Sequence, residues 1–279
     1  MACIAHISDV HFGAHEDARV DAVVEAVNAA RPTLTVLSGD LTQRARSDQY
    51  RQAVAFIDRL PAPRIVVPGN HDIPLWNVWD RFMHPLRNYK TLVTAEMWPE
   101  YEDDELYVLG VNSARSLTGR YDGFWKDGRV SREQIAEIRR RFTERSGKKF
   151  KVVVTHHPFV PPPGESKHKT VHNAAAALEA LAQLDVDVVL AGHLHESYSG
   201  DVRTHHETLK RGILSIQAGT ACSTRTRGER NAFNLLDLAG DTATLRVLSL
   251  EEGRFVEESP QHFERSEAGW QPRSPARAT

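Results

Sequence analysis

Strand-like and helix-like segments alternate along the first seventy residues, and this alternation constrains the fold more than any other feature of the chain. Short apolar runs typical of buried strands occupy residues 3–8, 34–37 and 65–67. Between them, residues 17–30 and 47–60 carry apolar side chains at helical spacing. Segments that alternate at this pitch build βαβ units, so the sequence predicts an α/β fold with a largely parallel sheet.

The same pattern continues through the middle of the chain and then changes. Strands are expected at residues 151–155 and 186–191, and Ser131 is a candidate N-cap for a helix that ends near Glu144. After residue 202, β-like segments follow one another without helices, which indicates an antiparallel section or a second sheet. Residues 259–279 contain three prolines and almost no apolar periodicity. We therefore expect one domain over residues 1–258 and a flexible tail over residues 259–279.

Residues of the types that bind metals follow five of the expected strands directly. They are Asp9, His11, Asp40, Asn70, His156, His193 and His195. Parallel strands end at one edge of a sheet, so these side chains are expected to converge. Each one alone is also ordinary turn chemistry, but turns do not require a histidine at four strand ends. Nitrogen and oxygen donors without sulfur suit Mn, Fe or Zn, and seven of them are enough for two divalent ions.

Composition excludes several other classes of function. The formal net charge is −2 and the charges of both signs are mixed, so no nucleic-acid partner is indicated. Cys3 and Cys222 are the only cysteines, which leaves no thiolate metal site. No leader-like segment opens the sequence and no apolar run approaches 18 residues. We expect a cytoplasmic protein without a membrane span, and the oligomeric state stays open.

Two long loops and one basic cluster are further candidates. Residues 113–129 and 159–172 form polar, glycine-containing or proline-rich loops, which in a domain of this size indicate a functional role. Arg225, Arg227 and Arg230 lie close together before a β-like segment. A solvated face is the first interpretation of this cluster, and a phosphate contact is the alternative.

The ordered motifs resemble those of the calcineurin-like metallophosphoesterases. The resemblance is carried by Asp9-x-His11, Gly39-Asp40, Gly69-Asn70-His71-Asp72, His156 and Gly192-His193-x-His195. It implies a four-layer α/β/β/α sandwich of two mixed sheets. It also implies one metal held by Asp9, His11, Asp40 and His195, and a second held by Asp40, Asn70, His156 and His193. Asp40 would then bridge the two ions, and a bridging hydroxide would be the nucleophile.

The resemblance makes His71 the catalytic residue. Its imidazole would face the substrate, where it could protonate the leaving oxygen, with Asp72 influencing its orientation. The alternative for His71 is a structural hydrogen bond to a neighbouring loop.

Departures from the family's subgroups narrow the expected function. Ser/Thr protein phosphatases carry Gly-Asp-x-x-Asp-Arg-Gly, whereas this chain has Gly-Asp-Leu-Thr-Gln-Arg-Ala at residues 39–45 and lacks the second carboxylate. This difference counts against a protein phosphatase. Arg44 still matches the arginine and is a candidate substrate-binding residue that anchors phosphate, with a solvated role as the alternative.

The motif set is most similar to class III cyclic nucleotide phosphodiesterases, a group that includes glycerophosphodiesterases. We therefore expect a dinuclear metal-dependent hydrolase of small phosphodiesters, with 3',5'-cyclic nucleotides as the leading substrate. The alternatives are a phosphomonoesterase or nucleotide-lipid pyrophosphatase of the same fold. A catalytically silent metal-binding scaffold is a third alternative, although such a protein would be expected to lack some of these residues.

Overall fold

The computed structural model describes residues 1–75, 77–116, 126–145, 149–162, 170–226, 228–267 and 269–273. Much of the two expected loops, residues 117–125 and 163–169, lies outside the described residues, as do Arg227 and residues 274–279 of the expected tail. Within the described ranges, no helix is both long and apolar enough to cross a bilayer.

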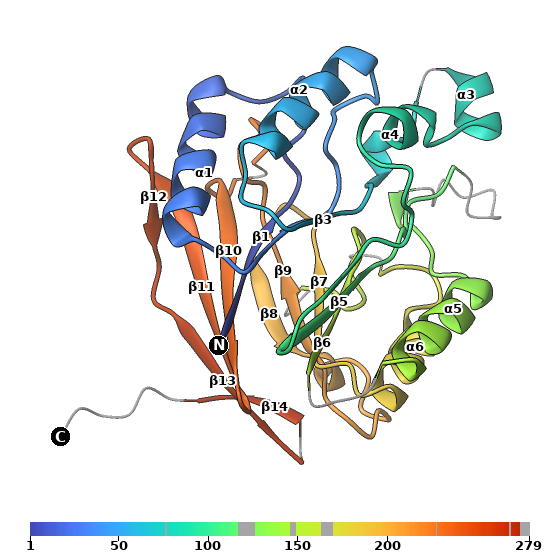
Figure 1. Ribbon diagram of the computed structural model, residues 1–279, viewed down its shortest axis with the longest axis vertical. Coiled ribbons are helices and arrows are strands. Elements are labelled where there is room, and N and C mark those ends of the chain that lie inside the picture. The colour runs from blue at the N-terminus through green and yellow to red at the C-terminus, as the bar shows by residue number, and fades with distance from the viewer. Residues whose placement is uncertain are drawn as a thin grey trace.

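Two mixed β-sheets pack face to face between two layers of helices (Figure 1). The first sheet has the order β14-β13-β11-β10-β1-β2-β3, with β12 paired to β11. Its strands are β1 (Ala2–Ile7), β2 (Leu34–Leu37), β3 (Arg64–Val66), β10 (Ala232–Ala239), β11 (Thr242–Glu251), β12 (Arg254–Glu257), β13 (Gln261–Ser266) and β14 (Gly269–Pro272). β1, β2 and β3 run parallel, and β10 pairs with β1 in the antiparallel sense.

The second sheet has the order β4-β5-β6-β7-β9-β8. Its strands are β4 (Glu100–Glu102), β5 (Leu106–Gly110), β6 (Phe150–Val154), β7 (Val188–Ala191), β8 (Tyr198–Asp201) and β9 (Leu214–Gln217). β5, β6, β7 and β9 are parallel, and β4 and β8 complete the sheet as antiparallel edges. The single largely parallel sheet of the sequence pattern is therefore divided between two sheets.

Two pairs of helices cover the outer faces of the sandwich. The α-helices of the described residues are α1 (Asp17–Ala30), α2 (Ser47–Asp58), α3 (Val78–Met83), α4 (Arg87–Leu92), α5 (Arg132–Thr143) and α6 (Ala174–Gln183). α1 and α2 lie over the first sheet, and α5 and α6 lie over the second (Figure 1). Short 3₁₀ turns occupy η1 (Asn70–Asp72) and η3 (Val202–Thr204), so the β-like segment expected from residue 202 is not a strand.

Three apolar cores separate these four layers. Along β1, Ile4 belongs to the core between the sheets, while Ala5 and Ile7 belong to the core under α1 and α2. Successive side chains of a strand point to opposite faces, so a strand covered on both sides reads as continuously apolar. This explains why the short apolar runs of the sequence predict buried strands correctly. The order of layers, helices, sheet, sheet and helices, confirms the expected four-layer α/β/β/α sandwich.

The expectation of a flexible tail from residue 259 is wrong for residues 261–266 and 269–272, which form strands. β13 pairs with the edge of β11, and β14 pairs with β13. Phe263 and Trp270 are buried in the core between the sheets, and the Trp270 amide donates to the Asp201 carboxylate at 3.0 Å. Each strand buries one large side chain, which leaves no apolar periodicity to detect in the sequence.

Candidate metal centre

The expected ligands meet because the carboxyl ends of strands from both sheets face one another. β1 and β2 supply Asp9, His11 and Asp40, while β6 and β7 of the second sheet lead to the three histidines. Backbone bonds hold the strand-end loops together within each sheet: the His11 amide donates to the Asp40 carbonyl, and the Gly192 amide to the His156 carbonyl, both at 3.0 Å. Asn70 and His71 arrive on the 3₁₀ turn that follows β3.

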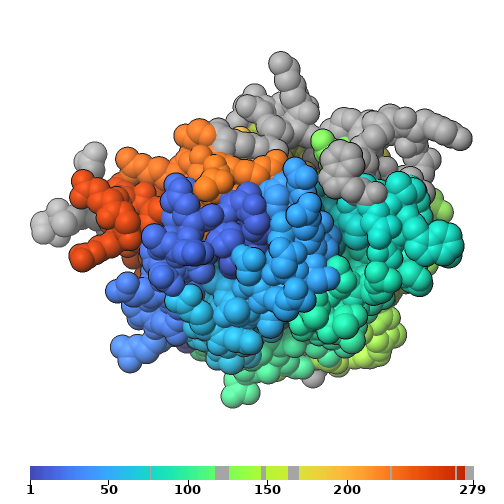
Figure 2. Space-filling model, turned by 90° about the horizontal axis from the view of Figure 1, so that it is seen from above, coloured from blue at the N-terminus to red at the C-terminus, as the bar shows by residue number. Residues whose placement is uncertain are grey.

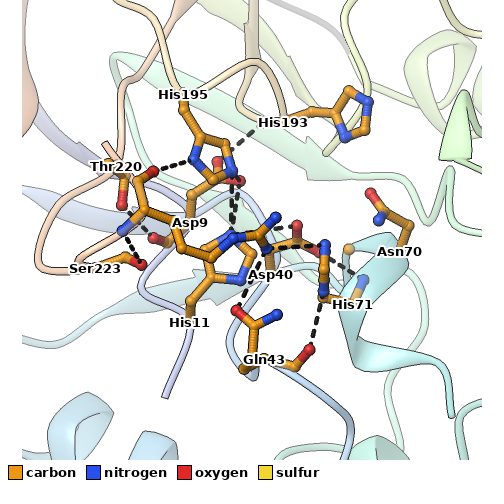
Figure 3. Close-up of polar contacts among 12 residues, drawn as sticks. Asp9, His11, Asp40, Gln43, Asn70, His71, His193, His195, Thr220 and Ser223 are labelled. Atoms are coloured by element: carbon orange, nitrogen blue, oxygen red, sulfur yellow. Dashed lines mark hydrogen bonds and ion pairs between the residues drawn. The ribbon is translucent and has the colours of Figure 1, made fainter. Parts of the chain in front are cut away.

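Four donor atoms converge on one point. Asp9, His11, Asp40 and His195 each offer one ligand atom, and these four atoms lie within 4.8 Å of one another (Figure 3). His195 Nε2 is 3.1 Å from His11 Nε2 and 3.2 Å from Asp9 Oδ1, and His11 Nε2 is 3.6 Å from Asp40 Oδ2. With metal–ligand bonds of about 2.0–2.2 Å, neighbouring ligands of a tetrahedral ion lie about 3.3–3.6 Å apart and those of an octahedral ion about 3 Å. The observed spacings fit a divalent ion.

A second set of donors shares one atom with the first. Asp40 Oδ2 is also 3.4 Å from His156 Nε2, which lies 3.2 Å from Asn70 Oδ1. His193 packs beside this set, with its ring centroid 5.2 Å from that of His156. Asp40 Oδ2 therefore stands between two groups of nitrogen and oxygen donors.

Asp9, His156 and His195 each turn one atom toward the centre because the protein already binds their other atom. Asp9 Oδ2 accepts from the Ser8 hydroxyl at 2.6 Å and from the His193 amide at 2.9 Å. Asp9 Oδ1, by contrast, is buried without a hydrogen-bond partner among the described residues. His156 Nδ1 donates to the Ser38 carbonyl and His195 Nδ1 to the Arg225 carbonyl, at 2.8 and 2.7 Å. These outer bonds leave Nε2 as the atom of both rings that is aimed at the centre, the orientation that metal-binding histidines require.

The backbone at the centre is strained. Five non-glycine residues of the two donor sets have left-handed φ angles between 47° and 78°: Asp9, His11, Asp40, His193 and His195. Such conformations cost free energy for residues with a Cβ and gather at functional sites. Gly39 adopts φ +100°, and a Cβ there would lie 2.7 Å from His156 Nδ1. The motif glycines therefore permit the close approach of the two sheets.

The buried charges stabilise one another. Burial opposes ionisation of Asp9, but His195 and His11 hold the pKa of its carboxyl well below the usual value. Burial likewise opposes protonation of His156, yet Asp40 raises the pKa of this imidazole to about 9. The carboxylates thus create a negative centre that attracts cations, whether protons or metal ions.

His71 lies beside the donor sets and not within them. Its imidazole is half-buried, and its ring stands edge-on to His11 with centroids 4.8 Å apart. Its amide donates to Asp40 Oδ1 at 2.8 Å, and its Nδ1 donates to the Gln43 carbonyl at 2.9 Å (Figure 3). The structural hydrogen bond expected as the alternative for His71 is therefore present at Nδ1, and the catalytic role of the ring stays a prediction.

Asp72 does something other than orient His71. Its buried carboxylate accepts hydrogen bonds from the amides of Gly69, Leu41 and Thr42, at 2.9, 3.1 and 2.9 Å, and from the Thr42 hydroxyl at 3.0 Å. Burial, helped by the charge of Asp40, raises the pKa of the Asp72 carboxyl to about 6 against the effect of these amides. Asp72 thereby ties the loop that carries Asp40 to the loop that carries Asn70.

His157 and Arg44 lie outside the two donor sets described above. His157 is buried beside His156 and shares a hydrogen bond of 2.8 Å with the Ser113 hydroxyl. Arg44 is exposed and lines a surface hollow with Arg46 and Arg51. Its role as a phosphate anchor stays a prediction.

Arg225, from the basic cluster, is the arginine that reaches the centre. Its Nη1 lies 3.3 Å from His71 Nε2 and 3.3 Å from Gln43 Oε1. In the sequence, only its membership of the basic cluster indicates that Arg225 has a role at the site. Membership of the cluster does not distinguish Arg225 from its exposed neighbour Arg230.

Comparison with known proteins agrees with this geometry. The calcineurin-like phosphoesterase family matches residues 3–197. A probable cyclic nucleotide phosphodiesterase of Xenorhabdus bovienii is 22% identical over 85% of this chain and 96% of its own length. A cAMP/cGMP dual specificity phosphodiesterase of Mycobacterium tuberculosis is 26% identical over 91% of this chain and 81% of its own. The glycerophosphodiester phosphodiesterase GpdQ of Enterobacter lignolyticus is 28% identical, over 57% of each chain.

Solved structures of low identity share the fold. A dimetal phosphatase from Danio rerio superposes with a TM-score of 0.64 at 15% identity, covering 92% of this chain and 98% of that one. A purple acid phosphatase from yellow lupin gives a TM-score of 0.68 at 12% identity, and the match covers 92% of this chain and 52% of the lupin protein. The family match, the two-sheet sandwich and the donor sets agree, and the chain belongs to the calcineurin-like phosphoesterases, hydrolases of phosphoric esters.

Proposed function

We propose that this protein is a dinuclear metal-dependent phosphodiesterase that hydrolyses small phosphodiesters, with 3',5'-cyclic nucleotides as the leading substrate class. The observation that carries the proposal is the position of Asp40 Oδ2, within 3.6 Å of a donor nitrogen on each side. One carboxylate oxygen shared by two donor sets is the arrangement expected of a centre for two divalent ions, here Mn, Fe or Zn.

The nitrogen and oxygen donors of the two sets fit such ions, and they can be divided between two of them. Asp9, His11, Asp40 and His195 would hold one ion, and Asp40, Asn70, His156 and His193 the other. Two bound divalent cations supply Lewis acidity and a nucleophile at neutral pH. The strand-end loops hold the donors in place before substrate arrives, which lowers the reorganisation needed for reaction.

His71 would act as the general acid that protonates the leaving group. Because Nδ1 donates its proton to the Gln43 carbonyl, the neutral ring carries a lone pair on Nε2, on the side away from that carbonyl. A proton taken up at Nε2 can be passed to the leaving oxygen as the P–O bond breaks.

Two relatives of high coverage are named for cyclic nucleotides, which supports this class ahead of glycerophosphodiesters. A phosphomonoesterase is the second candidate, because the phosphatase from Danio rerio has the same fold over almost its whole length. A silent scaffold is disfavoured because all seven donors and His71 are present.

The decisive experiment compares substrates and one variant. Metal-free protein is loaded with Mn²⁺ and assayed with bis(p-nitrophenyl) phosphate, p-nitrophenyl phosphate and 3',5'-cyclic AMP. We expect diester turnover that depends on metal, and a loss of about 10²–10⁴-fold in His71→Ala with the Mn content unchanged. His205→Ala, at an exposed histidine, is the matched control.

Turnover of the monoester alone would replace the proposal with a phosphomonoesterase. Stoichiometric Mn²⁺ binding without turnover of any of the three substrates would favour the scaffold.

A further inference from the structure

We propose that Arg225 is a substrate-contacting residue of this centre, whose guanidinium binds the non-bridging oxygens of the phosphodiester. The inference rests on the proposed function and adds to it a phosphate anchor other than Arg44. Arg225 lies beyond residues 3–197, the part of the chain that matches the family.

The described residues of the segment between β9 and β10, 218–226 and 228–231, include several that are fixed against the loop that follows β1. The Thr220 hydroxyl donates to the Asp9 carbonyl at 2.6 Å, and the Ala221 amide donates to the Ser8 carbonyl at 3.1 Å. The Ser223 hydroxyl donates to the Ala14 carbonyl at 2.9 Å. Seen from above, this orange part of the chain lies directly against the blue N-terminal part (Figure 2). Arg225 is therefore presented by a segment that is anchored at the metal-ligand loop itself.

The backbone of Arg225 is part of the centre. Its carbonyl accepts the Nδ1 proton of His195 at 2.7 Å, and its amide donates to the Ser223 hydroxyl at 3.1 Å. The side chain of Arg225 thus starts next to the candidate ligand His195 and extends to His71.

The guanidinium has neutral partners there. Nη1 lies 3.3 Å from both Gln43 Oε1 and His71 Nε2, and the residue is exposed. Among the described residues, no carboxylate forms a salt bridge with Arg225, in contrast to Arg230, which pairs with Glu251. An exposed arginine that is directed at a catalytic site by neutral groups keeps its charge available to an anion.

A phosphodiester is the ligand class that suits this position. A guanidinium donates along parallel N–H bonds that match two phosphate oxygens, and these charge-assisted bonds are stronger than bonds to an amide or imidazole. A substrate phosphoryl group over the donor sets would therefore draw Arg225 away from His71 Nε2. The same movement would leave Nε2 open for the leaving oxygen.

The test uses Arg225→Gln and Arg225→Lys, with Arg230→Gln as the matched control from the same segment. The first readout is calorimetric binding of inorganic phosphate to Mn²⁺-loaded protein, and the second is kcat/KM for bis(p-nitrophenyl) phosphate. In Arg225→Gln we expect both to fall by about 10- to 100-fold, the effect of losing charge-assisted hydrogen bonds. Arg225→Lys should recover only part of the phosphate affinity and of kcat/KM, since an ammonium lacks the parallel N–H bonds of the planar guanidinium. Arg230→Gln should match the wild type.

Mn²⁺ content separates substrate contact from a structural role. The substitutions keep the backbone carbonyl that accepts from His195, so the bound Mn²⁺ should stay at the wild-type stoichiometry. Loss of Mn²⁺ from Arg225→Gln, or unchanged phosphate affinity in an active enzyme, would overturn the inference.

The two proposals also fail in different ways. If the wild type turned over no diester while phosphate binding still depended on Arg225, the proposed function would be wrong and the anion contact would stand.

Discussion

Single residues around the centre have two kinds of role. Some would contact substrate, and others hold in place the loops that carry the candidate metal ligands. Asp72 belongs to the second kind, since its carboxylate accepts three amide protons and one hydroxyl from two different strand-end loops. An asparagine at this position would turn one acceptor into a donor that faces backbone N–H groups. A buried donor without an acceptor costs about 1–3 kcal/mol.

We therefore expect Asp72→Asn to lower the free energy of unfolding by about 1–3 kcal/mol and to weaken Mn²⁺ binding by at least about tenfold. Urea denaturation of the metal-free protein and Mn²⁺ titration measure the two effects. Asp104→Asn, at an exposed carboxylate, is the control. A variant as stable as this control would show that the two loops are held by other contacts.

At the scale of elements, the strand pair β13–β14 is part of the sandwich and not an appendage. Trp270 is only 2% exposed and packs in the core between the sheets, and the Arg265 guanidinium lies over its ring at 5.8 Å. Arg265 also forms ion pairs with Asp187 and Asp241, so β13 is linked to the second sheet as well as to β11.

Trp270→Ala should therefore lower the free energy of unfolding by about 3–5 kcal/mol, the usual cost of removing a large buried aromatic. Val256→Ala on β12, where the side chain is 46% exposed, should change it by no more than about 0.5 kcal/mol. Guanidinium chloride unfolding followed by fluorescence and circular dichroism checks both. Equal stability of the two variants would mean that β14 contributes little to the core.

The expected helix at residue 131 shows what local sequence predicts well. α5 begins after Ser131, whose hydroxyl accepts from the Gln134 amide at 3.2 Å, and it ends at Thr143, one residue before the predicted end. Cap and helix depend on neighbours in sequence, so no tertiary information is needed.

At the scale of the whole molecule, the donor sets join the two sheets. Asp9, His11 and Asp40 follow strands of the first sheet, while His156, His193 and His195 follow strands of the second. An ion bound by donors from both sheets would bind the native state alone, because the unfolded chain separates donors that lie far apart in sequence.

Adding Mn²⁺ should accordingly raise the Tm of the metal-free protein. At about 100 times Kd the stabilisation is about 2.7 kcal/mol, which corresponds to roughly 5–10 °C for a chain of this size. Asp40→Asn should abolish most of the shift because it changes the atom shared by both sets, whereas Asp104→Asn should keep it. Differential scanning calorimetry at several Mn²⁺ concentrations measures the effect, and a full shift in Asp40→Asn would contradict a shared carboxylate.

The sequence by itself determined the buried strands, the capped helix and the residue types at the strand ends, because each depends on a few consecutive side chains. Only the tertiary structure decided how the strands divide between the two sheets, that residues 261–266 and 269–272 complete the first sheet, and that Arg225, and not Arg44, extends to His71. Those outcomes depend on contacts between residues far apart in the sequence, such as Thr220 with Asp9, which are 211 positions apart. Local pattern carries no information about such contacts, since the free energy that selects them comes from packing and hydrogen bonds formed only in the assembled fold.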